Sequence, residues 1–272
     1  MAIITLPTHY YRQFDADYSL DVPGEGYGGW DKADLPLNLD HTALVVMHAL
    51  DCGTNEQVPG HFRAVEYIPR SYDISRTVFP GLLGAVRASG MKVAHVGMGE
   101  SYCKPYPGYR RIVELSGPGP ALSERADEDP VSQQLIRFRA DHVFPGANNH
   151  ADITKGYPLR KFPREAEPVG DEAVALTSHQ LNAWCKREKI NHLIYIGFAI
   201  NWCLLMSPGG MLDMSRNGII CSAIRQAVTA VENKETARLE LNKELALWRV
   251  ALAFGFVYDA DDVIEALRSE QG

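Results

Sequence analysis

The chain has few cysteines, and none of them lie close together. The five cysteines among its 272 residues form no Cys-x-x-Cys pair; they are Cys52, Cys103, Cys185, Cys203 and Cys221. An odd number at such wide spacing argues against a disulfide framework and against a structural zinc site. Free thiols persist in a reducing compartment, so the cytoplasm is the simplest setting.

Long apolar runs and clusters of basic residues are also lacking. No segment approaches the roughly 20 apolar residues that span a bilayer. The first twenty residues lack the basic start and apolar core of a signal peptide. Lys and Arg are spread along a chain of net charge -7, which argues against nucleic acid and membrane surfaces as partners. No Walker sequence occurs and no Gly-x-Gly-x-x-Gly follows the first strand, so no nucleotide cofactor is expected.

What the sequence does have is 46% hydrophobic residues, in short apolar runs that alternate with helical patterns. This alternation predicts a three-layer α/β/α sandwich around a mostly parallel sheet. Six strands are expected, at residues 42–47, 91–96, 172–176, 193–196, 219–224 and 256–258. Helices are expected at residues 74–89, 131–144, 178–188, 239–254 and 263–268. The helix at 239–254 has Leu241, Leu245, Trp248 and Leu252 along one side.

Three regions do not follow this alternation of strands and helices. Residues 1–40 contain several turn signals and many aromatic side chains, so we expect an N-terminal arm that packs on the domain or on a partner subunit. Residues 54–72 predict a loop. Residues 101–170 predict a long insertion over one end of the sheet, within a main domain that spans residues 41–272.

The most informative stretch is Asn191–Gly218. Its apolar run predicts a buried strand that Gly197 ends. Asn201 is placed as a helix N-cap, and Cys203 falls in the first helical turn, where exposed N–H groups favour a thiolate. Strand, turn and cysteine in this order are typical of a nucleophile. A buried structural cysteine behind a strand is the alternative interpretation.

Parallel sheets bind ligands beyond the carboxyl ends of their strands. This rule brings together the residues that follow the strands at 42–47, 91–96 and 193–196. The candidate site residues are therefore His48, Asp51, Cys52, Gly97, Glu100, Asn201, Trp202 and Cys203.

Four pieces of the chain resemble, in order, the isochorismatase-like cysteine hydrolases, a superfamily that includes nicotinamidases and N-carbamoylsarcosine amidohydrolases. TALVVM resembles the superfamily's first strand, and LLGAVRASGMKVAHV resembles the following helix and second strand. HLIYIGFAINWC resembles the signature strand and nucleophile turn, and ALAFGFVYDADDVIEAL resembles the closing helix, strand and helix. The resemblance covers roughly residues 40–268, and residues 101–170 match poorly.

The resemblance implies a hydrolase that acts on a C–N bond of a small amide-like molecule, with Cys203 as the nucleophile. The backbone N–H groups of Ala199 and Cys203 would form the oxyanion hole, helped by a cis peptide between Phe198 and Ala199. A homo-oligomer, a dimer or a tetramer, is also implied, with the arm and the insertion as interface pieces. No metal is expected, because GMGESYC stands where nicotinamidases have a metal-binding Asp-x-His.

Two partners of the nucleophile do not match the superfamily's pattern. His48 occupies the place of the general-base Asp, and no Lys leads from the strand at 172–176 into its helix. Lys155 and Lys161, in the preceding loop, are candidates for the missing lysine.

These departures leave two interpretations. In the first, Cys203 pairs with His48, which Asp51 or Glu100 orients, as in other cysteine hydrolases. In the second, the protein is a catalytically inactive relative that binds a small molecule or serves as a structural subunit.

Overall fold

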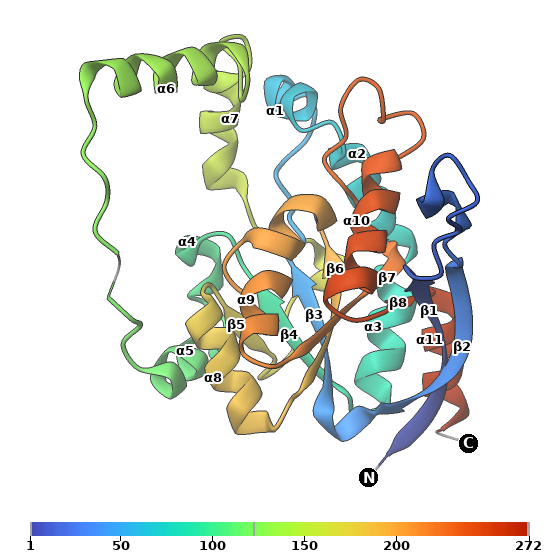
Figure 1. Ribbon diagram of the computed structural model, residues 1–272. Coiled ribbons are helices and arrows are strands. Elements are labelled where there is room, and N and C mark those ends of the chain that lie inside the picture. Colours follow the sequence, from blue (N-terminus) through green and yellow to red (C-terminus); the bar gives the residue numbers. More distant parts are fainter. Residues whose placement is uncertain (1, 122, 271–272) are drawn as a thin grey trace.

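An eight-stranded sheet lies between two layers of helices in the computed structural model, which describes residues 2–121 and 123–270 (Figure 1). The strand order is β2-β1-β8-β7-β6-β3-β4-β5. The strands are β1 (Ile3–Arg12), β2 (Gly29–Asn38), β3 (Thr42–Met47), β4 (Lys92–Val96), β5 (Ala173–Ala175), β6 (His192–Gly197), β7 (Ile220–Val228) and β8 (Val257–Tyr258). The predicted three-layer α/β fold is confirmed. The six strands from β5 to β8 in this order are parallel and are the six that the sequence predicts.

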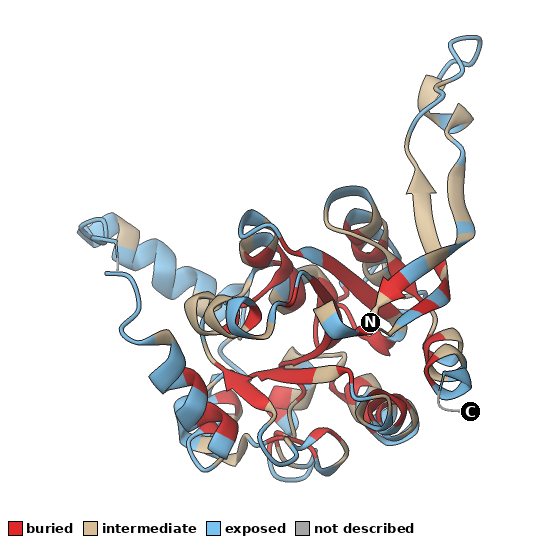
Figure 2. Cartoon of the chain, turned by 90° about the horizontal axis from the view of Figure 1, so that it is seen from below, coloured by how far each residue is buried: buried red, intermediate tan, exposed pale blue. Residues whose placement is uncertain are grey.

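The number of strands is a correction, because the N-terminal arm is a β-hairpin that extends the sheet. β1 pairs with β2 along ten residues of each strand but meets β8 through the single pair His9–Val257. Only the first part of β1 alternates buried with exposed residues, at Ile4 and Leu6. The outer half of the hairpin stands away from the body of the molecule (Figure 2).

The two faces of the sheet build two separate cores. Along β3, Ala43, Val45 and Met47 face a core shared with α8 (Ser178–Glu188), α9 (Met211–Arg216) and α10 (Leu241–Ala253). The alternate residues Leu44 and Val46 face a core shared with α3 (Phe79–Ala88) and α11 (Ala260–Ser269). Every side chain of β3 is buried, which explains why this strand is a continuous apolar run. Each large aliphatic side chain buried here contributes about 1.5–3 kcal/mol.

Helices also occupy the regions expected to lack a period. The predicted loop at 54–72 contains α1 (Pro59–Ala64) and the start of α2 (Ile68–Thr77), each with a proline in its first turn. The insertion contains α4 (Glu100–Cys103), α5 (Pro107–Ser116), α6 (Pro130–His142) and α7 (His150–Gly156). Apart from α6, which the sequence predicts, these helices have ten residues or fewer, so they leave little hydrophobic period to read. None of the helices in the described ranges is long and apolar enough to cross a membrane.

Helix α6 has no buried residue and lies well away from the sheet (Figures 1 and 2). A capping box between Asp129 and Ser132 fixes its start, as the side chain of each residue bonds the backbone of the other. Its predicted position, residues 131–144, is confirmed to within two residues.

The apolar side expected for α10 faces outward. Leu241, Leu245 and Leu252 are exposed, whereas Ala246, Leu247 and Val250 are the residues that enter the core. Leu241 and Leu245 instead border a groove beside Trp248 and the aromatic rings of the hairpin.

A buried charge cluster fastens β4 to the segment before β5. His95 is fully buried, and its Nε2 lies 2.9 Å from Glu172 Oε2. Arg87 donates to both oxygens of the same carboxylate, at 2.7 and 2.9 Å. Burial alone would raise the pKa of Glu172, but the hydrogen bonds from His95 and Arg87 outweigh it and lower the pKa to about 2.

We predict that Glu172→Gln removes a pH-dependent part of the stability. The folded pKa lies below the ordinary value of 4.5, so the stabilisation is present above pH 4.5 and is lost as pH falls toward 2. A shift of this size corresponds to about 3 kcal/mol. Urea unfolding at pH 7, 4.5 and 3 should show that the difference in unfolding free energy between the wild-type protein and the variant becomes smaller as the pH falls. Glu114→Gln, which removes an exposed carboxylate, serves as the control, and an equal pH dependence in both variants would contradict the prediction.

Candidate active site

A cavity of about 350 Å³ lies at the carboxyl ends of β3, β4 and β6, where the sequence places the site. Four of the residues predicted for the site line it: His48, Cys52, Trp202 and Cys203. Its other walls come from α1, α2, the insertion and the segment after β7.

The position of the turn that leads to Cys203 is set by Gly197. Its φ of +123° is a conformation that L side chains rarely adopt, and a Cβ there would lie 1.9 Å from the carbonyl oxygen of Met47. Gly197 and Met47 are also partners in the register of β6 and β3. The chain therefore crosses the end of β3 in direct backbone contact, which only glycine allows.

Directly after Gly197, the peptide bond between Phe198 and Ala199 is cis, where the resemblance places it. A π-helical turn, Ile200–Leu204, then carries Cys203 at the cavity wall. Ala199 is fully buried, and within the described ranges its N–H donates to no acceptor. A buried N–H without a partner is available to a ligand oxygen.

Asn201 is not the N-cap that the sequence predicts. The cap position belongs to Ala199, and no side chain caps this turn. The Asn201 amide instead pairs twice with the backbone of Val231, donating to its oxygen at 2.9 Å and accepting from its N–H at 2.8 Å. The turn begins two residues earlier than the sequence predicts, so Asn201 lies within it and its side chain holds the cavity wall.

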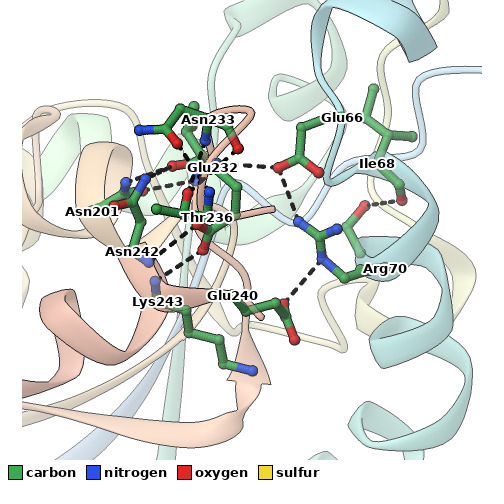
Figure 3. Close-up of polar contacts among 12 residues, drawn as sticks. Glu66, Ile68, Arg70, Asn201, Glu232, Asn233, Thr236, Glu240, Asn242 and Lys243 are labelled. Atoms are coloured by element: carbon green, nitrogen blue, oxygen red, sulfur yellow. Dashed lines mark hydrogen bonds and ion pairs between the residues drawn. The ribbon is translucent and has the colours of Figure 1, made fainter. Parts of the chain in front are cut away.

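A network beyond Asn201 fixes that wall (Figure 3). Glu232 is buried and accepts from the N–H groups of Asn242 and Lys243, at 3.1 and 3.0 Å, in the first turn of α10. The N–H of Glu232 donates in turn to Glu66, which also pairs with Arg70 at 2.9 Å. Both acidic side chains at the cavity wall are thus already engaged.

His48 is the first residue beyond β3. Its φ is +51°, its N–H donates to the carbonyl of Val96 at 3.0 Å, and its side chain is buried. Its Nδ1 is buried and has no partner among the residues that the structure describes. Burial first, and then the charge of Arg160, lower the pKa of His48 to about 4. The imidazole is therefore neutral at pH 7.

Asp51 and Glu100 do not line the cavity. The Asp51 carboxylate accepts from the Tyr72 hydroxyl at 2.8 Å and pairs with Lys161 at 3.3 Å, and the backbones of Asp51 and Lys161 form an isolated bridge. Glu100 is exposed and pairs with Lys104 at 3.1 Å. Neither carboxylate contacts His48 in the structure.

Lys155 does not replace the missing lysine in the cavity either, because its ammonium group donates to the Gln57 carbonyl on the surface. Cys52 does line the cavity, and burial raises the pKa of its thiol.

Several cavity residues had no signal in the sequence, notably His61 on α1, Tyr67 before α2, and Tyr157 and Arg160 from the insertion. Tyr67 lines the cavity together with Cys203 and Cys52, and burial, followed by these nearby thiols, raises the pKa of its hydroxyl. His61 is buried, and its pKa is lowered first by burial and then by Arg160. All of these residues come from segments without hydrophobic periodicity. In the described part of the chain, no three His, Cys, Asp or Glu side chains are grouped to hold a metal ion.

The fold resembles that of isochorismatase-family cysteine hydrolases. Similar structures include a cysteine hydrolase from Pseudomonas syringae pv. phaseolicola 1448A, at 14% identity and a TM-score of 0.48, covering 87% of this chain and 96% of that one. An isochorismatase family protein from Desulfovibrio vulgaris subsp. vulgaris str. Hildenborough has 16% identity and a TM-score of 0.43. The match covers 84% of this chain and 98% of that one. N-carbamoylsarcosine amidase from Thermoplasma acidophilum has 15% identity and a TM-score of 0.39. The match covers 81% of this chain and 96% of that one. No family model and no curated protein matches the sequence.

We predict that Gly197→Ala disrupts the site by disrupting the fold around it. The added Cβ meets the Met47 carbonyl at a distance that no rotamer can relieve, so a loss of more than about 2 kcal/mol is expected. Gly218→Ala is the matched control, because Gly218 also has a positive φ, +82°, but has open space around it. Urea unfolding compares the two variants, and equal losses would show that the contact with β3 is unimportant.

Proposed function

We propose that this protein is a cysteine-dependent hydrolase of the isochorismatase-like superfamily that cleaves a C–N bond of a small amide-like molecule. One observation supports the proposal above all. Cys203 lines the same cavity as a buried, neutral His48 whose Nδ1 has no partner among the described residues. A nucleophile and a proton acceptor thus share one enclosed space.

The proposed reaction follows from these groups. Cys203 Sγ attacks the amide carbon while the imidazole of His48 takes the thiol proton, and the carbonyl oxygen becomes an oxyanion held by the Ala199 and Cys203 N–H groups. Collapse of this adduct breaks the C–N bond, and His48 returns the proton to the leaving amine. Water, deprotonated by His48, then hydrolyses the thioester and releases the acid and the free thiol.

A second candidate function is a binding subunit without turnover. It is favoured by the pairing of Asp51 with Lys161, which engages both groups outside the cavity. It is also favoured by the low pKa of His48, because a buried imidazolium is costly to form.

The two functions differ in the reactivity of Cys203. For the hydrolase we expect iodoacetamide to alkylate Cys203 at least about tenfold faster than the buried Cys185 at pH 7, and His48→Asn to slow that reaction. Peptide mass spectrometry against time gives both rates. Cys203→Ala should abolish the turnover of any primary amide that the wild-type protein hydrolyses, whereas Cys185→Ala should leave it intact. Equal alkylation of Cys203 and Cys185 would favour the binding subunit.

The pH profile offers a separate prediction. A base with a pKa of about 4 is protonated only below that value, so the acid limb of kcat/KM should fall near pH 4 and not near the ordinary histidine value of 6.5. Hydrolysis rates between pH 3.5 and 8, at substrate concentrations below KM, measure this limb. A limb near 6.5 would mean that another group, or an exposed histidine, takes the proton.

A further inference from the structure

Three buried nitrogen atoms of the cavity walls have no hydrogen-bond partner among the described residues: His48 Nδ1, His61 Nδ1 and Arg160 Nε. Most buried polar atoms in proteins are paired, so unpaired ones on residues that line a cavity point to contacts that a ligand or water completes. Two of the three belong to neutral imidazoles, and the third belongs to a permanent cation.

Arg160 makes no ion pair in the described part of the chain. The acidic residues nearest along the cavity wall are engaged elsewhere, Glu66 with Arg70 and Glu232 with the start of α10 (Figure 3). Asp51 pairs with Lys161. The guanidinium of Arg160 instead lies over the ring of Tyr157, with its carbon 4.0 Å from the ring centroid. Stacking of this kind orients a guanidinium without neutralising its charge.

We propose that Arg160 binds a carboxylate on the substrate, so that the molecule hydrolysed at Cys203 carries an anionic group beside its amide bond. A guanidinium that is partly withdrawn from water and lacks a counter-ion is costly, and a ligand carboxylate supplies the missing charge. The planar fork of Arg matches the two carboxylate oxygens, which gives geometric as well as electrostatic selectivity. The catalytic part of this inference rests on the proposed function, whereas the binding part does not.

Binding of a carboxylate also has a consequence for the proposed base. The charge of Arg160 is the second cause, after burial, that lowers the pKa of both His48 and His61. An anion beside Arg160 offsets that charge, so His48 accepts a proton more readily in the presence of substrate than in the empty site.

Two alkylating reagents of nearly the same size test the proposal without knowledge of the substrate. Iodoacetate carries a carboxylate and iodoacetamide a neutral amide, and both form a thioether at a thiolate with loss of iodide. We expect Cys203 of the wild-type protein to prefer iodoacetate, and Arg160→Gln to lower the ratio of the two rates about tenfold or more. Arg160→Lys should keep part of the preference, because the charge remains but the fork is lost.

Arg164→Gln is the matched control, because Arg164 is an exposed arginine of the same segment and does not line the cavity. It should leave the ratio unchanged. The iodoacetamide rate of each variant, together with its circular dichroism, reports whether the fold around Cys203 is intact. A ratio that is the same in the wild-type and Arg160→Gln proteins would overturn the carboxylate site, while rapid alkylation by iodoacetamide would leave the proposed function standing.

If neither reagent alkylates Cys203, the proposed function fails, and a second measurement decides the carboxylate site. Saturation-transfer NMR then compares acetate with acetamide on the wild-type, Arg160→Gln and Arg164→Gln proteins. A signal for acetate that only Arg160→Gln abolishes supports the site. Equal signals for acetate and acetamide, or an acetate signal that survives Arg160→Gln, overturn it.

Discussion

The close approach of β6 to β3 at Gly197 is the contact on which the site depends. Gly197 and Met47 are partners in the sheet register, and a Cβ on Gly197 would collide with the Met47 carbonyl. The segments that follow β3 and β6 leave the sheet from this one point. On one side Met47 is followed at once by His48, and on the other Gly197 leads through the cis peptide to Cys203. Cys203 and His48 are therefore placed at one cavity by backbone packing within the sheet, before any contact between their own side chains is required.

The parts of the fold that the sequence predicts are those whose burial leaves a pattern. The six parallel strands are covered on both faces, and continuous apolar runs such as residues 42–47 follow from that. The hairpin was missed because β1 meets the rest of the sheet through only one residue pair, so most of it needs no apolar face. The buried face of α10 is predicted wrongly, because its exposed leucines form a strong helical stripe that does not enter the core.

The candidate site divides in the same way. Cys203 and His48 follow strands that the sequence locates, so their positions could be inferred from chain order alone. The residues of the opposite wall could not be inferred in this way, because His61 and Arg160 lie far apart in the sequence and in segments without a hydrophobic period. Contacts between the insertion and α1 bring them together, including the 2.8 Å hydrogen bond from the Gly60 N–H to Asp152 and the one from Lys155 to the Gln57 carbonyl. Such contacts between polar groups at long sequence separation leave no trace in composition or spacing.

The charges of the cavity differ from the pattern that the sequence resemblance implies. An Asp and a Lys beside a cysteine place one negative and one positive charge at the nucleophile. In this chain Asp51 and Lys161 satisfy each other outside the cavity, while a neutral His48 and a cationic Arg160 stand within it. A substrate carboxylate on Arg160 offsets the charge of the guanidinium, and it favours the protonated form of His48 at the moment when the thiol must lose its proton. On the proposed function, the substrate itself thus raises the proton affinity of the base that activates Cys203.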